Sequence, residues 1–150
     1  ALWPLMAASE QQDNDIRKYE EIGTHPAANH NAIAVALAFH RSIGAERKIA
    51  RLRYLRNRWA DRLLKEGSGR VKMFTKIGPT ESGAIAVVGV DGLDMGALGG
   101  WLNAKHRMIA TPVVDGEFAG LRVTPSVYTT VDEVDRFAEA MLVAIKRGIA

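Results

Sequence analysis

The 150-residue sequence contains no cysteine, which excludes disulfide-stapled scaffolds, zinc ribbons and thiolate nucleophiles. Long apolar runs are also missing, because the longest, residues 32–39, is far shorter than the ~20 residues that cross a membrane as a helix. Neither sign of charge dominates, since 20 Lys and Arg stand against 17 Asp and Glu, a formal net charge of +3. So small an excess predicts neither a nucleic acid nor a membrane as partner.

What is present is the composition of an ordinary globular domain, with 47% apolar and 25% charged residues. A chain of this length can bury a core without a disulfide or a structural metal. The N-terminal residues 1–6 are apolar from the start and carry no basic region of a signal peptide. We expect the sequence to begin inside a longer protein. Any targeting signal would then lie outside it, and the cytoplasm is the default localisation.

The spacing of apolar residues changes along the chain from a helical period to an alternating one. Helices are expected from Asn29 or Asn31 to Ile43, over 45–66, over 94–105, and from a capping box at Thr130–Glu133 onward. Strands are expected at 71–75, 84–90, 107–114 and 121–128. This order predicts an α+β fold in which helices cover a small, mostly antiparallel sheet of about four strands.

The expected strand 121–128 carries the first candidate site residue. Strict alternation places Arg122 on one face together with Thr124, Ser126 and Tyr128. An arginine held on a strand beside hydroxyl groups is a rigid two-pronged donor, suited to a carboxylate or a phosphate. The alternative is an arginine on an edge strand that faces water. Pro125 favours an edge or a bulge, because proline cannot donate a ladder hydrogen bond.

A second candidate site is the Gly23–Thr24 turn, which precedes the first expected helix. Glycine lets backbone N–H groups approach an anion and threonine adds a hydroxyl donor, so the turn suits a phosphate. The alternative is an ordinary junction between a loop and a helix. His25 and His30 lack the spacing and the carboxylate neighbours of a metal site, so we expect no metal.

The expected helix that ends at Glu66 is strongly basic. From Glu46 onward it holds eight Lys and Arg against three acidic residues. A nucleic-acid interface would also need positive charge across the whole domain and residues that read bases. The net charge of this helix is larger than the net charge of the whole chain, so the rest of the chain is net acidic. We therefore expect a solvated face whose long side chains cover apolar surface.

Several motifs in a fixed order give the chain a resemblance to a known family. They are residues 18–24 (KYEEIGT), 32–44 (AIAVALAFHRSIG), 51–63, 105–112 (KHRMIATP), 120–130 (GLRVTPSVYTT) and 132–137. Together they resemble the C-terminal part of the class V aminotransferase family, which are fold-type I pyridoxal-phosphate enzymes, and in particular its isopenicillin N epimerase-like members. The resemblance covers nearly the whole chain.

The resemblance implies roles for the two candidate sites. Arg122 would bind the α-carboxylate of an amino-acid or peptide-like substrate. Thr24, with Gly23 and His25 beside it, would reach the phosphate of pyridoxal 5'-phosphate across the interface of a homodimer. Residues 1–31 would then be a connecting segment at the large-domain and dimer interface, and residues 32–150 the C-terminal small domain.

The departures from the family pattern concern covalent chemistry. None of the lysines stands in the sequence context of the family's Schiff-base lysine, so the resemblance implies no catalytic residue in this chain. The cofactor would be bound mainly by an upstream domain, and the chain alone would be inactive. The absence of cysteine disfavours sulfur transfer and leaves epimerisation or transamination. The alternative function is a non-catalytic α+β module for binding or assembly.

Overall fold

A computed structural model describes residues 14–20, 23–24 and 26–149, and the chain divides into two compact units at Gly44. The described part of the first unit contains a short 3-10 helix, η2 (Ile16–Tyr19), and helix α1 (Ala27–Ile43). The expected asparagine caps are wrong, because α1 begins at Ala27, upstream of both. Pro26 precedes the helix, where its fixed φ and missing N–H are compatible with a helix start.

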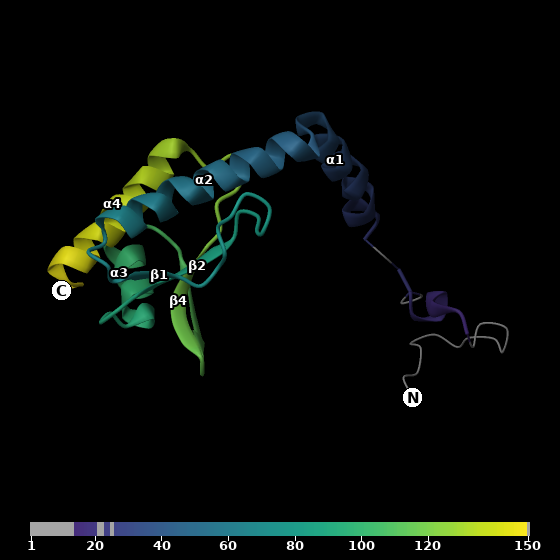
Figure 1. Cartoon of the computed structure of the whole chain (residues 1–150). Helices are drawn as coiled ribbons and strands as arrows, with labels where there is room; N and C mark the ends of the chain where they lie inside the picture. The colour runs from purple at the N-terminus through teal and green to yellow at the C-terminus, as the bar shows by residue number, and fades with distance from the viewer. Residues whose placement is uncertain (1–13, 21–22, 25, 150) are drawn as a thin grey trace. The chain divides into compact units, whose positions relative to one another are not determined.

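The second unit follows the predicted order of elements. It contains α2 (Ala45–Glu66), β1 (Val71–Met73), β2 (Ala86–Val90), α3 (Met95–His106), β3 (Thr111–Asp115), β4 (Phe118–Val123) and α4 (Val131–Arg147). All pairings in the four-stranded sheet are antiparallel, and the strand order is β1-β2-β4-β3 (Figure 1). The predicted α+β fold with a small antiparallel sheet and helices is therefore confirmed.

The hydrophobic core of the second unit lies on one face of the sheet. It joins Leu63 of α2, Leu98 of α3 and Met141 of α4 to Val88 of β2 and Leu121 of β4. These five side chains are all fully buried. Because residues two apart on a strand share a face, the inward face of β2 comprises Ala86, Val88 and Val90. Three helices thus cover the same face of the sheet.

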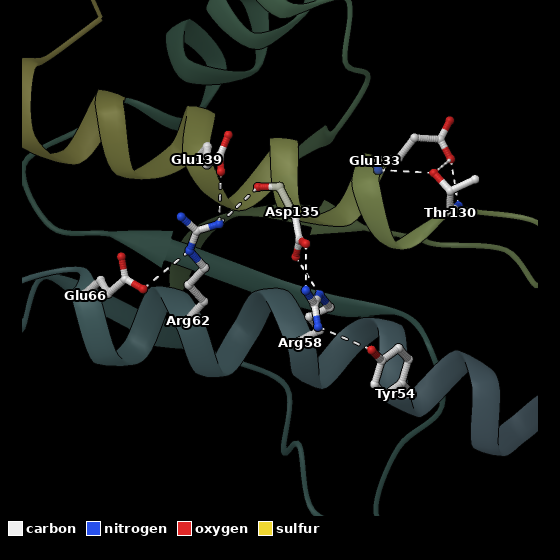
Figure 2. Close-up of polar contacts among 8 residues, drawn as sticks. All are labelled: Tyr54, Arg58, Arg62, Glu66, Thr130, Glu133, Asp135 and Glu139. Atoms are coloured by element: carbon white, nitrogen blue, oxygen red, sulfur yellow. Dashed lines mark hydrogen bonds and ion pairs between the residues drawn. The ribbon is translucent and has the colours of Figure 1, made fainter.

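Helices α2 and α4 lie side by side and run in the same direction (Figure 1). Arg58 of α2 pairs with Asp135 of α4, and one turn later Arg62 lies 3.5 Å from Glu139 (Figure 2). A step of four residues on each helix in the same sense requires parallel axes. Between the helices, the Trp59 ring packs edge-on against a ring of α4, that of Phe137, with centroids 5.6 Å apart.

The opposite face of the sheet carries glycines on two neighbouring inner strands. A Cβ at Gly89 of β2 would lie 2.7 Å from the Phe74 ring, and one at Gly120 of β4 would lie 3.3 Å from it. The Phe74 ring in turn packs on the Phe118 ring, with centroids 4.9 Å apart. The two glycines therefore leave the space that this aromatic pair occupies. Arg122 belongs to the same face, two residues beyond Gly120 on β4.

Candidate functional site

Arg122 lies near the end of an inner strand. In the sheet register it stands opposite Val87 of β2 on one side and Thr111 of β3 on the other. The edge position in the alternative interpretation is therefore wrong, but the Arg122 side chain is exposed to solvent, as that alternative expected. The strand also ends earlier than predicted, at Val123, so Pro125 lies in the loop that follows. An inner strand needs a backbone N–H at alternate positions on each side, and proline has none to offer.

The shortened strand changes the surroundings expected for Arg122. Ser126 and Tyr128 lie in the loop after β4 instead of continuing its face. The Ser126 backbone N–H donates to the Thr129 hydroxyl at 2.9 Å, which shapes that loop as a turn. Thr111, directly across on β3, is the exposed hydroxyl residue that the register places beside Arg122.

The Arg122 side chain is exposed, and within the described residues its guanidinium has no hydrogen bond and no ion pair. Some other arginines of this unit are engaged, whereas the guanidinium groups of Arg107 and Arg136 also have no hydrogen bond or ion pair among the described residues. Arg51 and Arg53 each donate to a backbone carbonyl at 3.0 Å, and Arg70 donates to the carbonyls of Asp91 and Ile145. Arg122 thus keeps all its donors available for a partner outside the described chain, and its planar fork matches a carboxylate.

The Gly23–Thr24 turn belongs to the first unit. Gly23 adopts a φ of +90°, a conformation that glycine tolerates without the steric penalty of a side chain. Both residues are exposed. His25, the third residue expected near a cofactor phosphate, lies outside the described residues. The phosphate role of this turn stays a prediction.

The residues present fit a contribution to a pyridoxal-phosphate site but not a complete one. Such a site needs a lysine for the covalent bond and a partner for the pyridine nitrogen. The chain offers a Gly-Thr turn suited to the phosphate and an unpaired arginine suited to a substrate carboxylate. No residue of the sequence is assigned to the two remaining roles.

The second unit also contains a cleft of about 500 Å³ that the sequence did not reveal. Its walls come from α2, from the turn after α3, from the end of β4 with its loop, and from the first turns of α4. The lining residues are Trp59, His106, Arg107, Met108, Ile109, Val123, Thr124, Pro125, Thr129, Glu133, Val134, Arg136 and Phe137. Arg122 is not among them. These residues are spread over the chain from 59 to 137, and folding alone brings them together.

Arg56 corrects the prediction of a fully solvated basic face on α2. Its side chain is completely buried, and its guanidinium donates to the carbonyl oxygens of Ile77, Ser82 and Gly83 at 2.8, 3.0 and 2.7 Å. It also contacts the Ser82 hydroxyl. Burial lowers the pKa of the Arg56 guanidinium. Arg56 therefore anchors the loop between β1 and β2, a structural task.

Comparisons with known proteins give no identification of this chain. It matches no protein-family model, and no curated protein matches it. Among the described helices, none combines the length and apolar character needed to span a bilayer.

Proposed function

We propose that this chain is the C-terminal domain of a pyridoxal-phosphate-dependent enzyme of the class V aminotransferase family, isopenicillin N epimerase-like. The reaction is an epimerisation or a transamination of an amino-acid or peptide-like substrate. In this proposal the chain supplies Arg122 to bind the substrate carboxylate, while an upstream domain supplies most of the cofactor site. The order of the sequence motifs supports the family, and the antiparallel sheet with helices on one face is consistent with a small domain of this kind.

The single observation that carries the proposal is the state of Arg122. An arginine with a structural role, in a core or in a network of surface ion pairs, has partners within its own chain. The Arg122 guanidinium has no such partner among the described residues. It is held on an inner strand with neighbours on both sides, so its backbone is fixed. A fixed strand that presents an unpaired two-pronged donor is suited to orienting a carboxylate.

In the proposed enzyme, Arg122 acts by positioning. Two parallel hydrogen bonds to the substrate carboxylate would fix the rotation about the bond between Cα and the carboxyl carbon. The cofactor, when bound, supplies the electron sink for a carbanion at Cα. Removing such a bidentate donor is expected to cost about 2–4 kcal/mol of transition-state stabilisation, from charged hydrogen bonds and orientation together. Thr24, Gly23 and His25 would contact the cofactor phosphate of the partner subunit in a homodimer.

The test uses the protein that joins this chain to its proposed upstream domain, loaded with pyridoxal phosphate. Exchange of the Cα proton of amino acids in D₂O, followed by NMR, reports the step that epimerisation and transamination share. Arg122→Gln should lower kcat/KM for this exchange by about 30- to 1,000-fold, the rate equivalent of the loss above. An unchanged kcat/KM would remove the assignment.

Lys72→Gln is the matched control for that experiment. Lys72 lies on β1 at a position that alternation places on the same sheet face, and its exposed amine pairs with Asp91 at 3.0 Å. Its loss removes a cation from this face without touching the inner strand. The exchange rate should stay unchanged in this variant, whereas an equal loss in both would indicate a general charge effect.

The second candidate function is a binding module without catalysis. The 500 Å³ cleft favours it, because all of its lining residues belong to the second unit. Under this alternative the 150-residue chain binds its ligand alone, and no upstream domain changes that affinity. Under the first proposal, the isolated chain leaves the absorption spectrum of added pyridoxal phosphate unchanged, and the joined protein alters it.

A further inference from the structure

We propose that the cleft between α2, the end of β4 and the start of α4 binds a small organic carboxylate with an apolar body. This inference does not rest on the pyridoxal-phosphate proposal, since neither Arg122 nor the Gly23–Thr24 turn lines the cleft. Its volume of about 500 Å³ lies in the range of small-molecule sites in proteins.

Part of the cleft lining is apolar. Val123, Val134 and Phe137 line it, with Pro125 from the loop after β4. Ile109, also in the lining, is 88% exposed, a large apolar side chain left almost entirely in water. An apolar ligand body would cover Ile109 and gain the free energy of removing this surface from water.

The wall contributes a hydrogen-bond donor without an acceptor. Trp59 is 1% exposed, and its Nε1–H is buried with no hydrogen-bond partner among the described residues. Buried indole N–H groups usually have a partner, because an unsatisfied donor costs desolvation free energy. Trp59 lines the cleft, so the NMR signal of its indole N–H can report a ligand that binds there.

The lining of the cleft carries an excess of positive charge, with Arg107 and Arg136 against Glu133. The guanidinium groups of Arg107 and Arg136 make no ion pair or hydrogen bond with any described residue. Glu133 also lines the cleft, but its carboxylate accepts the Thr130 N–H at 2.7 Å and the Thr130 hydroxyl at 2.9 Å. Both bonds end on Oε2 of Glu133 and lower the pKa of this carboxyl, and the charge of Arg136 lowers it further. The two arginines against one carboxylate leave a net positive charge in the cleft lining, which suits a carboxylate ligand.

The position of Arg107 is fixed by the backbone. It stands at the end of α3 with a φ of +56°, and its backbone N–H donates to the carbonyl of Asn103 at 3.1 Å. The next residue, Met108, donates to Leu102 at 3.2 Å and closes the same helix end. This pair of hydrogen bonds terminates the helix and directs the following residues along the cleft. Two arginines without an ion pair and several apolar lining residues together match an amphipathic carboxylate.

The first experiment titrates the ¹⁵N-labelled 150-residue chain with 3-phenylpropionate and follows the indole N–H signals by NMR. The Trp59 signal is identified by its absence in Trp59→Phe, or by sequential assignment if that variant does not fold. We expect a saturable shift of the Trp59 signal. The neutral amide 3-phenylpropanamide lacks the negative charge, and inorganic phosphate lacks the apolar body. Each should therefore bind at least about fivefold more weakly than 3-phenylpropionate.

Arginine variants locate the charge recognition. Arg107→Gln and Arg136→Gln should each weaken 3-phenylpropionate binding by about fivefold, the effect of losing one partly solvated charged hydrogen bond. Arg147→Gln is the matched control, because Arg147 is exposed on the last turn of α4 and does not line the cleft. No saturable shift of Trp59, equal affinity for the amide or for phosphate, or an equal loss in Arg147→Gln would each overturn the proposal.

Discussion

Arg58 and Asp135 join α2 to α4 through two parallel hydrogen bonds. The Arg58 Nε lies 2.6 Å from Asp135 Oδ1, and its Nη2 lies 2.7 Å from Oδ2 (Figure 2). The remaining Nη1 donates to the Tyr54 hydroxyl at 3.3 Å. A fork-to-fork pair of this kind fixes orientation as well as distance. It therefore sets the register of two parallel helices whose apolar stripes form the core.

This pair should make stability depend on acid pH. Arg58 holds the pKa of the Asp135 carboxyl below its ordinary value. A carboxyl whose pKa is lower in the folded state contributes stability above its unfolded-state pKa of about 3.9, and loses that contribution as the pH falls through the folded-state value. Asp135→Asn should therefore lower the free energy of unfolding at pH 7, and the difference from the parent should shrink below about pH 3, as measured by urea titration.

Glu139→Gln provides the comparison for that pH series. Glu139 is 61% exposed on its side chain and lies 3.5 Å from Arg62, a longer contact without the two-pronged geometry. Exposed pairs of this kind contribute little. The variant should differ only slightly from the parent at every pH. A gap between Asp135→Asn and the parent that stays constant down to about pH 2 would contradict the assignment to ionisation.

Arg56 should be far more important to stability than its neighbour Arg53. Arg56→Met leaves the carbonyls of Ile77 and Gly83 without their donor, and we expect a loss of about 3 kcal/mol. Arg53 makes one bond, from Nε to the Ser82 carbonyl at 3.0 Å, so Arg53→Met should cost about 1 kcal/mol or less. Urea unfolding measures both. Equal losses would show that charge on α2, and not the buried network, governs the effect.

The sequence predicted correctly those helices and caps that depend on residues close together in the chain. The bounds of α2 are those expected, and Gly44, with a φ of +86°, lies between it and α1. The capping box is present, because Thr130 and Glu133 need only each other and the backbone between them. The predicted end of β4 was wrong because alternation continues past Val123 after the ladder bonds have stopped.

Contacts between residues far apart in the sequence explain the features that the sequence did not reveal. Arg56 lies beside the apolar stripe of α2, but its burial depends on carbonyls more than 20 residues away in the β1–β2 loop. The cleft is assembled from residues of separate elements, among them Trp59 of α2 and Phe137 of α4, whose rings pack edge-on only in the folded chain. Arg122 was identified from alternation alone, but its inner position and lack of a partner required the sheet order.

Substitution by alanine at two adjacent glycines of α3 should change the stability of the protein in opposite directions. A Cβ at Gly99 would lie 2.9 Å from Pro112 Cγ on β3, whereas one at Gly100 meets nothing within 4 Å. Gly100→Ala should stabilise the protein by about 0.5–1 kcal/mol, because alanine loses less backbone entropy in a helix. Gly99→Ala should destabilise it by about 1–3 kcal/mol through overpacking. Thermal unfolding of both variants checks the sign, and two gains would contradict the close packing of α3 on β3.

The capping box at the start of α4 can be tested by removing one hydroxyl. The Thr130 hydroxyl accepts the backbone N–H of Glu133 at 3.2 Å and donates to its carboxylate at 2.9 Å. Thr130→Ala leaves that N–H without its side-chain acceptor, and we expect a loss of about 1 kcal/mol, or roughly 5 °C in Tm for a unit of this size.

Thr130→Ser is the control for this experiment, because it removes the methyl group of Thr130 and keeps the hydroxyl. Serine keeps the acceptor for the Glu133 N–H and is an equally good N-cap, so its Tm should stay close to that of the parent. Because Glu133 also lines the cleft, Thr130→Ala releases part of its carboxylate toward the two arginines there. The same variant should therefore bind 3-phenylpropionate more weakly than Thr130→Ser. Equal affinities would mean that Glu133 keeps its place through the 2.7 Å hydrogen bond from the Thr130 backbone N–H alone.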